Sequence, residues 1–247
     1  MNSPRLYAVI SVLLLLTFWQ LLANTLQLPA LPPASKVFQQ LAVVIQNGQL
    51  PYHLGITLAR LLVSFSLSMI IGILIGIGLG RHHQLNQFFD QWLLILLNIP
   101  ALVTIILCYL WFGLTETAAI LAVIINKVPN VVVTIREGTR ALDQRLLEMA
   151  QSYRFSRWKT YRYVIWPQLF PYLMAAARTG LALIWKIILV VELLGCSNGM
   201  GYQIHLFFQL FDVTSILAYT IAFIIVIQLI EMLILKPLEK RANAWRQ

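Results

Sequence analysis

The chain has 247 residues, of which 60% are hydrophobic and only 11% are charged, and its mean hydropathy is +0.78. A soluble domain of this length needs a more polar surface, so the composition excludes that class and indicates an integral membrane protein. The formal net charge of +9 does not indicate a nucleic-acid-binding protein, because the basic residues flank apolar runs and form no single basic face.

Long apolar runs predict helices that cross a bilayer, since one crossing takes about 20 apolar residues. The sequence therefore predicts an all-α, polytopic membrane protein with about six transmembrane helices. The expected spans are Leu6–Leu26, Arg60–Gly80, Phe89–Phe112, Thr117–Ile135, Pro171–Leu194 and Val213–Leu235. The first run is too long for a cleaved signal peptide, so we expect it to be retained.

The loops between these spans predict how the protein is oriented. If the N-terminus is cytoplasmic, most of the 18 basic residues fall on the cytoplasmic side, as the positive-inside rule requires. We therefore expect both termini and the segment 136–168 to be cytoplasmic. Between the first two spans, prolines over Pro29–Pro33 forbid a straight helix, and the following apolar residues predict a short helix along the outer surface.

Three glycines in the second span are spaced four residues apart. Gly72, Gly76 and Gly80 share one helical face, and small residues in this register let another backbone approach closely in a membrane. We interpret this face as a helix-packing groove. The alternative is that glycine is merely tolerated at these positions.

The segment 136–168 interrupts the apolar runs with arginines and aromatic residues. Projected as one helix, it forms an amphipathic stripe, which we expect to end at Pro167 before the next span begins at Pro171. Such a helix either lies on anionic lipid or inserts into a groove on a partner protein. Large aromatic and arginine side chains favour a protein partner. The members of the stripe are Leu146, Leu147, Ala150, Tyr153, Trp158, Tyr161, Val164 and Ile165.

Several motifs resemble those of binding-protein-dependent ABC transporter permeases. Glu148, Ala150 and Ser152, followed by the residues up to Pro167, resemble the "EAA" loop of that family. "LPPASKVFQQL", "NIP" and "ELLGCSNGMGYQI" resemble three further family segments. The resemblance covers about residues 28–205 and is nearest to the nitrate/sulfonate/taurine-type permeases. It implies the type I ABC importer permease fold, with residues 1–247 as a single transmembrane permease domain and 136–168 as its cytoplasmic coupling loop.

The resemblance also implies a function. The chain would be the membrane-spanning permease subunit of an ABC importer in the bacterial inner (plasma) membrane, moving a small solute, for example an anion such as nitrate, a sulfonate, taurine or bicarbonate. Its partners would be cytoplasmic ABC ATPase subunits, a periplasmic or lipid-anchored substrate-binding protein and a second permease copy. The residues expected to meet the ATPase are Glu148, Ala150, Ser152, Tyr153, Arg154, Arg157, Trp158 and Pro167.

The sequence contains no G-x-x-x-x-G-K-[ST] motif, so ATP hydrolysis is expected on a separate chain. The chain is therefore not expected to be an enzyme, and no motif indicates a cofactor or a metal site. Arg154 stands where the resembled loop has a glycine. Because arginine does not readily adopt a positive φ, we expect either a differently turned loop or a more continuous helix.

Charged residues inside the expected spans are costly and point to function. We interpret Lys127 and Lys186 as lining the translocation pathway, where they would favour an anion. The equally weighted alternative pairs them with Glu116, Glu192 or Glu231. We expect Arg178 to reach the cytoplasmic interface.

Two other functions remain open from the sequence. An ion-gradient-driven secondary transporter would need buried carboxylates and inverted internal repeats. Only Glu192 and Glu231 come close to the first requirement, and the sequence shows no convincing repeat. A membrane scaffold whose basic loop binds lipid is the third possibility.

Overall fold

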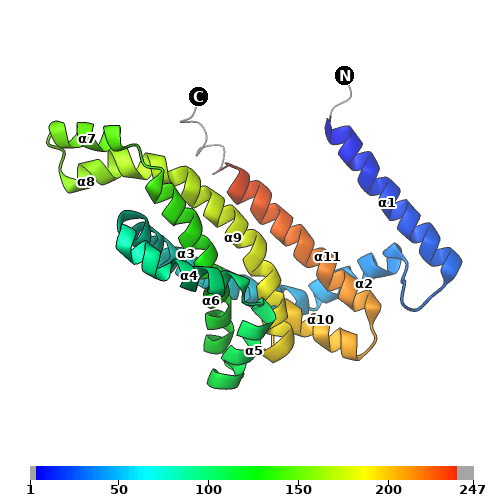
Figure 1. The fold of residues 1–247 in the computed structure, drawn as a ribbon. Coiled ribbons are helices and arrows are strands. Elements are labelled where there is room, and N and C mark those ends of the chain that lie inside the picture. Colours follow the sequence, from blue (N-terminus) through cyan, green and yellow to red (C-terminus); the bar gives the residue numbers. More distant parts are fainter. Residues whose placement is uncertain (1–3, 238–247) are drawn as a thin grey trace.

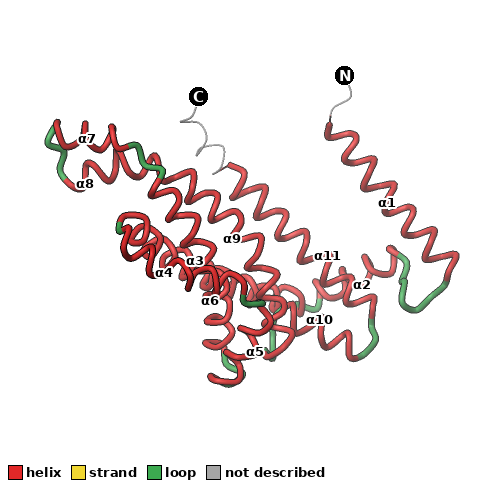
Figure 2. The backbone as a smooth tube through the Cα atoms, viewed as in Figure 1, coloured by secondary structure: helices red, strands yellow, loops and turns green. Residues whose placement is uncertain are grey.

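The computed structural model describes residues 4–237, and within that range all the regular elements are helices, as expected (Figures 1 and 2). The α-helices are α1 (Pro4–Leu26), α2 (Ala34–Gln46), α3 (Gln49–Arg81), α4 (His83–Asn98), α5 (Ala101–Phe112), α6 (Glu116–Arg140), α7 (Gln144–Ser152), α8 (Arg157–Thr160), α9 (Trp166–Gly195), α10 (Met200–Gln209) and α11 (Val213–Ile230). Two π-helical turns, η1 (Tyr161–Ile165) and η2 (Glu231–Leu235), precede α9 and follow α11.

Four helical stretches are long and apolar enough to cross a membrane: Gln49–Arg81, Glu116–Arg140, Arg157–Gly195 and Val213–Leu233. The pair α4 and α5 makes a fifth if it is counted as one broken span. In α1, the stretch Ile10–Leu26 is apolar but shorter. By length and composition, the described residues therefore contain four or five spans, and the predicted count of six is not confirmed.

The expectation of one continuous span over Phe89–Phe112 is wrong. Between α4 and α5 the chain bends by 94°. Pro100 has no backbone N–H and disfavours a helical conformation in the residue before it, and Ile99 is accordingly extended, with φ −68° and ψ 124°. The salt bridge from Arg136 Nη1 to Asp90 Oδ1, at 2.6 Å, joins α4 to α6.

The expected break between Pro167 and Pro171 is also wrong, because the helix continues from Arg157 to Gly195. Pro167 lies in the first turn of α9. Just before it, the N–H of Trp166 bonds to the carbonyl of Tyr161, five residues back, in η1. This wider turn accommodates the proline ring, which would otherwise crowd the preceding turn.

Among the described helices, α3 and α6 make the most extensive contact with each other. An added Cβ would lie 2.5 Å from Val131 at Gly72, 2.8 Å from Ile135 at Gly76 and 2.5 Å from Thr139 at Gly80. Each of the three glycines precedes its α6 partner by the same number of residues. The two helices therefore run in the same direction and meet in a single register. The three glycines thus let the backbones approach more closely than any larger residue would allow.

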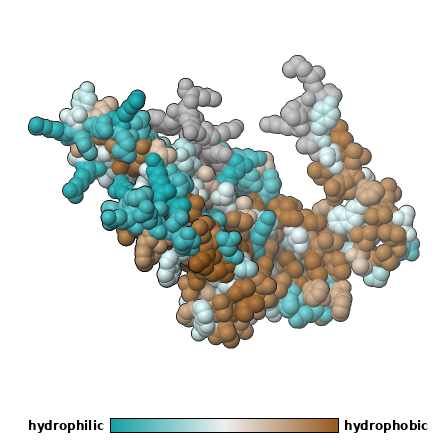
Figure 3. Space-filling view, viewed as in Figure 1, coloured by the Kyte–Doolittle hydropathy of each residue, from teal (hydrophilic) through white to brown (hydrophobic). Residues whose placement is uncertain are grey.

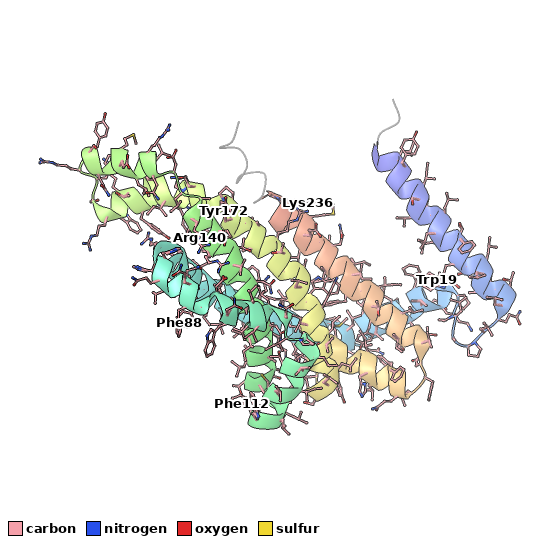
Figure 4. All side chains as sticks on the ribbon, viewed as in Figure 1. Trp19, Phe88, Phe112, Arg140, Tyr172 and Lys236 are labelled. Carbon is pink, nitrogen blue, oxygen red and sulfur yellow. The ribbon has the colours of Figure 1, made fainter. Side chains whose placement is uncertain are left out.

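The other helices surround this pair. Helix α9 packs on α6 and α3, and α11 contacts α2 and α10. Gly138 of α6 lies against the ring of Tyr172, at the junction of α6 and α9 (Figure 4). Helix α1 lies at the side of the molecule and joins α2, where Trp19 Nε1 donates to the Pro32 carbonyl at 3.1 Å (Figures 1 and 4). The buried core between α3, α5, α6 and α9 includes Leu61, Ile105, Ala122, Ile184 and Ile188.

The molecule has two distinct ends, which we call the α7 end and the α5 end. Helices α7 and α8 project at one end, toward which the start of α1 and the end of α11 also point (Figure 1). Helices α5 and α10 lie toward the opposite end (Figure 1). Hydrophilic side chains gather over α7 and α8, whereas hydrophobic ones cover α1 and the lower part of the bundle (Figure 3).

The α3–α6 contact predicts different effects for two glycines of the same helix. At Gly76 an added Cβ would lie 2.9 Å from the Val132 carbonyl oxygen, which cannot move aside, whereas at Gly78 it would meet nothing within 4 Å. Gly76→Ala should lower the free energy of unfolding by about 1–3 kcal/mol, and Gly78→Ala should leave it unchanged or raise it by up to about 1 kcal/mol. Unfolding of the two purified variants in detergent measures the difference, and equal stabilities would contradict the contact.

Candidate functional site

Residues 141–168 form a compact hairpin of short helices at the α7 end, which we call the coupling segment. The Asp143 carboxylate caps α7 by accepting the Arg145 N–H at 2.8 Å. The backbone N–H of Asp143 donates to Gln168 Oε1, also at 2.8 Å, and so ties the start of α7 to the first turns of α9. The Ser156 hydroxyl caps α8 by accepting the Lys159 N–H at 3.3 Å. The two ends of the segment are therefore tied to each other where the segment joins α6 and α9.

Arg154 makes the turn between α7 and α8 in a left-handed conformation, with φ +52°. The Phe155 N–H bonds to the Ala150 carbonyl and the Arg154 N–H to the Gln151 carbonyl, both at 2.9 Å, which is the hydrogen-bond pattern of a Schellman cap. Both expectations for this position are therefore wrong, since arginine adopts the backbone conformation that favours glycine. Holding arginine in this left-handed conformation costs about 1–2 kcal/mol of folding free energy.

The turn at Arg154 also breaks the amphipathic stripe, so the expectation of one continuous helix is wrong. Ala150 and Val164 are buried inside the hairpin, whereas Tyr153 is 73% exposed and Trp158 is 70% exposed. Of the other candidate docking residues, Glu148, Ser152, Arg154 and Arg157 are exposed and Pro167 is half-buried. The hairpin thus presents two large aromatic side chains and several arginines to its surroundings, a composition typical of interface anchors.

A buried polar network lies toward the α5 end, where α3, α6 and α9 converge. Arg60 of α3 is only 5% exposed and Glu192 of α9 is fully buried. Arg60 Nη1 lies 2.7 Å from Glu192 Oε1 and 2.9 Å from the Asn198 carbonyl. Arg60 Nε donates to Glu116 Oε2 at 2.8 Å, and Nη2 also contacts Glu116 Oε1 and Asn198 Oδ1.

The Glu192 carboxylate is satisfied from several sides. Thr57 Oγ1 lies 2.9 Å from both carboxylate oxygens, and the Gly201 N–H donates to Oε2 at 2.9 Å. Thr57 Oγ1 in turn accepts the Met200 N–H at 2.9 Å. A buried carboxylate with a cation and several donors is stable, whereas removing one partner leaves an uncompensated charge.

His53 extends the network to the turn between α9 and α10. Its Nδ1 accepts the Gly199 N–H at 3.0 Å, and its Nε2 lies 2.7 Å from the side-chain amide of Gln203. At Gly199 an added Cβ would lie 2.4 Å from the Glu192 carboxylate carbon, and at Gly201 it would lie 2.2 Å from the Leu189 carbonyl oxygen. The two glycines of "GMGY" therefore let the backbone close over the buried carboxylate.

Sequence reasoning missed this network. Glu192 was expected as a possible partner for a lysine or as a buried carboxylate of a secondary transporter, and Arg60 only as the beginning of a span. The available signal was a helical face of α3 on which polar residues recur at spacings of three or four. Its members, all buried, are His53, Thr57, Arg60, Ser64 and Ser68.

A second polar stripe follows α6 and was also missed. Asn126, Asn130 and Thr134 are half-buried. Each side chain donates to the carbonyl four residues earlier, at 2.8, 3.3 and 2.9 Å respectively. Polar residues within a membrane helix face the protein interior or a water-filled space, so this face of α6 is a candidate wall of a pathway.

The two candidate pathway lysines have different surroundings. Lys127 is 1% exposed, and its Nζ has no hydrogen-bond partner among the described residues. Lys186 is exposed on α9, with its Nζ 5.5 Å from the centre of the Trp185 ring.

The carboxylates considered as partners for these lysines pair with arginines. Glu116 and Glu192 bind Arg60, and Glu231 lies 3.7 Å from Arg178. Arg178 therefore reaches across to η2, which follows the end of α11 that points toward the α7 end (Figure 1). Its expected place at the cytoplasmic interface stays a prediction.

The buried network predicts a large coupling energy between Arg60 and Glu192. Arg60→Met alone should lower the free energy of unfolding by about 3–5 kcal/mol, because it leaves a buried carboxylate without its cation. The double variant Arg60→Met/Glu192→Gln should cost clearly less than the sum of its two single variants. A double-mutant cycle on protein unfolded in detergent measures this, and additive effects would show that the pair is not coupled.

Most of the chain matches a known transport family. Residues 68–241 match the family described as "Binding-protein-dependent transport system inner membrane component". The taurine transport system permease protein TauC of Escherichia coli (strain K12) is 28% identical, over 94% of this chain and 86% of that one. The SsuC protein of Bacillus subtilis (strain 168), named for aliphatic sulfonate transport, is also 28% identical, over 94% of this chain and 84% of that one.

Two further matches broaden the comparison. The riboflavin transport system permease protein RibX of Chloroflexus aurantiacus is 31% identical, over 98% of this chain and 91% of that one. A crystal structure of an amino acid ABC transporter matches 81% of this chain and 97% of its own, with a TM-score of 0.63 and 21% identity, which supports the fold alone. This chain belongs to the family of inner membrane components of binding-protein-dependent transport systems, as a permease of the nitrate/sulfonate/taurine type.

Proposed function

We propose that this permease carries a small anion into the cytoplasm, along a pathway between two copies of the chain. The observation that carries the proposal is the position of Lys186, an exposed cation within the long apolar stretch of α9. Taurine and aliphatic sulfonates, for which two of the relatives are named, share a negatively charged sulfonate group. RibX is named for riboflavin, so family membership alone does not define the charge of the solute.

The face of α9 that bears Lys186 is suited to a pathway. Lys186 lies nine residues before Gly195, which is about 14 Å along a helix. A lysine at that depth is costly if it faces lipid, so we infer that this face meets water or a second subunit. Its exposed members recur at spacings of three or four and are mostly small: Ala175, Thr179, Ala182, Lys186 and Val190.

We infer that a homodimer encloses the pathway, because a two-fold axis would bring two copies of this face together. Each copy would contribute one Lys186, and the polar stripe of α6 would supply further wall. The whole chain, residues 1–247, would then act as one permease domain without a catalytic centre, cofactor or metal of its own.

The coupling segment is proposed to receive the movement of a separate ATPase. Tyr153 and Trp158 are the large exposed anchors, and Arg154 and Arg157 lie beside them in sequence. The bias of basic residues supports a cytoplasmic α7 end, and the start of α1 points the same way (Figure 1). The α5 end would then face the substrate-binding protein. The comparisons give no support to the ion-gradient-driven alternative.

Replacing one of the exposed aromatic residues of the coupling segment should weaken binding of the ATPase to the permease. Trp158→Ala should weaken binding of the ATPase by about 30-fold, the effect of losing a central interface side chain worth about 2 kcal/mol. The matched control is Trp111→Ala on α5, which removes a similarly exposed tryptophan (67%) near the opposite end. Co-purification of the ATPase with each variant is the measurement, and equal recovery with both variants would contradict the docking role.

Replacing the α9 lysine tests the solute class. In vesicles containing the complete transporter, Lys186→Met should slow ATP-driven uptake of taurine about tenfold, equivalent to ~1.4 kcal/mol in the barrier. Lys186→Arg keeps the charge and should retain most of the uptake. Normal uptake by the methionine variant would exclude Lys186 from anion selection, and uptake without any ATPase would favour a secondary transporter.

A further inference from the structure

We propose that Lys127, Ser64 and Ser68 form an occluded site for a small monovalent anion between α3, α6 and α9. The anion is either chloride or the acidic group of the transported solute. The second of these rests on the proposed function, whereas anion binding itself can be measured without transport.

The first observation is an unusual group of unpaired polar atoms. Among the described residues, the buried side-chain atoms without a hydrogen-bond partner are Ser64 Oγ, Ser68 Oγ, Lys127 Nζ and the Tyr219 hydroxyl. Tyr219 belongs to a separate cluster with α10 and α11. The other three side chains lie along the contact between α3 and α6. Since buried polar groups are nearly always paired, three unpaired ones in one region indicate a missing partner.

The register of α3 and α6 places these three side chains at neighbouring levels of the helix contact, although none is hydrogen-bonded to another. The sequence offset that pairs Gly72 with Val131 also pairs Ser68 with Lys127, and Ser64 lies one turn earlier on the same face. Side chains on a helix lean toward its N-terminus. The Lys127 ammonium is therefore directed toward the level between Ser68 and Ser64.

Gly180 of α9 makes room for the lysine. An added Cβ at this position would lie 2.9 Å from Lys127 Cε and 3.4 Å from its Nζ. The lysine stem therefore crosses α9 where that helix has no side chain. The Lys127 ammonium is closely enclosed, and Gly180 accommodates the stem of the side chain. Lys127 is therefore buried as part of the folded structure and is not a surface lysine folded inward.

The chemistry of the three groups favours an anion. The ammonium offers three N–H donors and each serine one O–H donor. Burying an unpaired ammonium costs several kcal/mol unless a negative charge accompanies it, and a water molecule supplies no charge. The nearby carboxylates Glu116 and Glu192 are engaged by Arg60.

The site is closed in this conformation and lies behind the proposed pathway. The void that reaches Ser64, between Val123 and Ile188, is too narrow for a water molecule. An anion therefore enters only when the Lys127 side chain shifts to open a space beside its ammonium group. Asn126 and Asn130, on either side of Lys127 in the sequence of α6, are half-buried and give the lysine a polar route toward the stripe.

The test is the thermal stability of the complete transporter in detergent, titrated with sodium bromide or chloride against sodium gluconate at constant ionic strength. The wild-type protein should show a saturable rise in Tm with the halides, and Lys127→Met should abolish it. Ser64→Ala and Ser68→Ala should each weaken the apparent halide affinity about tenfold. Lys36→Met, which removes an exposed lysine of α2, is the matched control and should bind halide as the wild-type protein does.

A second series distinguishes the source of the anion. If the solute's acidic group occupies the site, taurine or methanesulfonate should raise Tm through Lys127 and compete with bromide; if chloride is the resident ion, only the halides should act. No halide effect in the wild-type protein, or an equal effect in Lys127→Met and both serine variants, would overturn the proposal. Loss of the halide effect in Lys186→Met alone would also overturn it, while leaving the anion pathway of the proposed function intact.

Discussion

The close contact of α3 with α6 is the constraint on which the rest of this structure depends. Gly72, Gly76 and Gly80 let the two backbones meet with a single register. The same register, continued along the helices, sets Arg60 beside the start of α6 and Ser68 beside Lys127. A bilayer provides no hydrophobic force between helices, so close packing and buried polar contacts must hold this pair together. The close packing and the buried polar contacts both occur on one face of α3.

The same frame connects the two functional regions. The C-terminal end of α6 leads directly into α7, and the hairpin returns through α8 and η1 into α9 without a break. At its other end, α9 carries Glu192, which binds Arg60 of α3 and the backbone of Gly201. We propose that a displacement of the coupling segment is transmitted as a rigid-body movement of α3, α6 and α9, which is an established form of domain transition. The left-handed Arg154 keeps the hairpin compact despite the absence of glycine.

The sequence predicted what depends on local composition, and missed what depends on tertiary contacts. Apolar run length located α1, α3, α6 and α11, because a helix that crosses a bilayer needs about 20 apolar residues. However, α3 begins at Gln49, eleven residues before the expected Arg60. Hydropathy could not show that Pro100 turns the chain by 94° while Pro167 leaves its helix intact, since the difference lies in the π turn before Pro167. The helix α10 was not anticipated. Arg60 and Glu192 are far apart in sequence, and only the folded structure brings them together. The resemblance of "GMGY" to a family segment identified the position but not its physical role.

The most direct test of this account is whether α3 and α6 move as one body during the transport cycle. Spin labels at Leu62 and Thr117 would report the distance between the two helices near the α5 end, and labels at Leu74 and Glu137 would report it near the α7 end. The account predicts that both distance distributions in the assembled transporter are the same with and without ATP, while the distance between the two Leu62 positions of a dimer changes. A change in either distance within one chain would contradict a rigid α3–α6 frame.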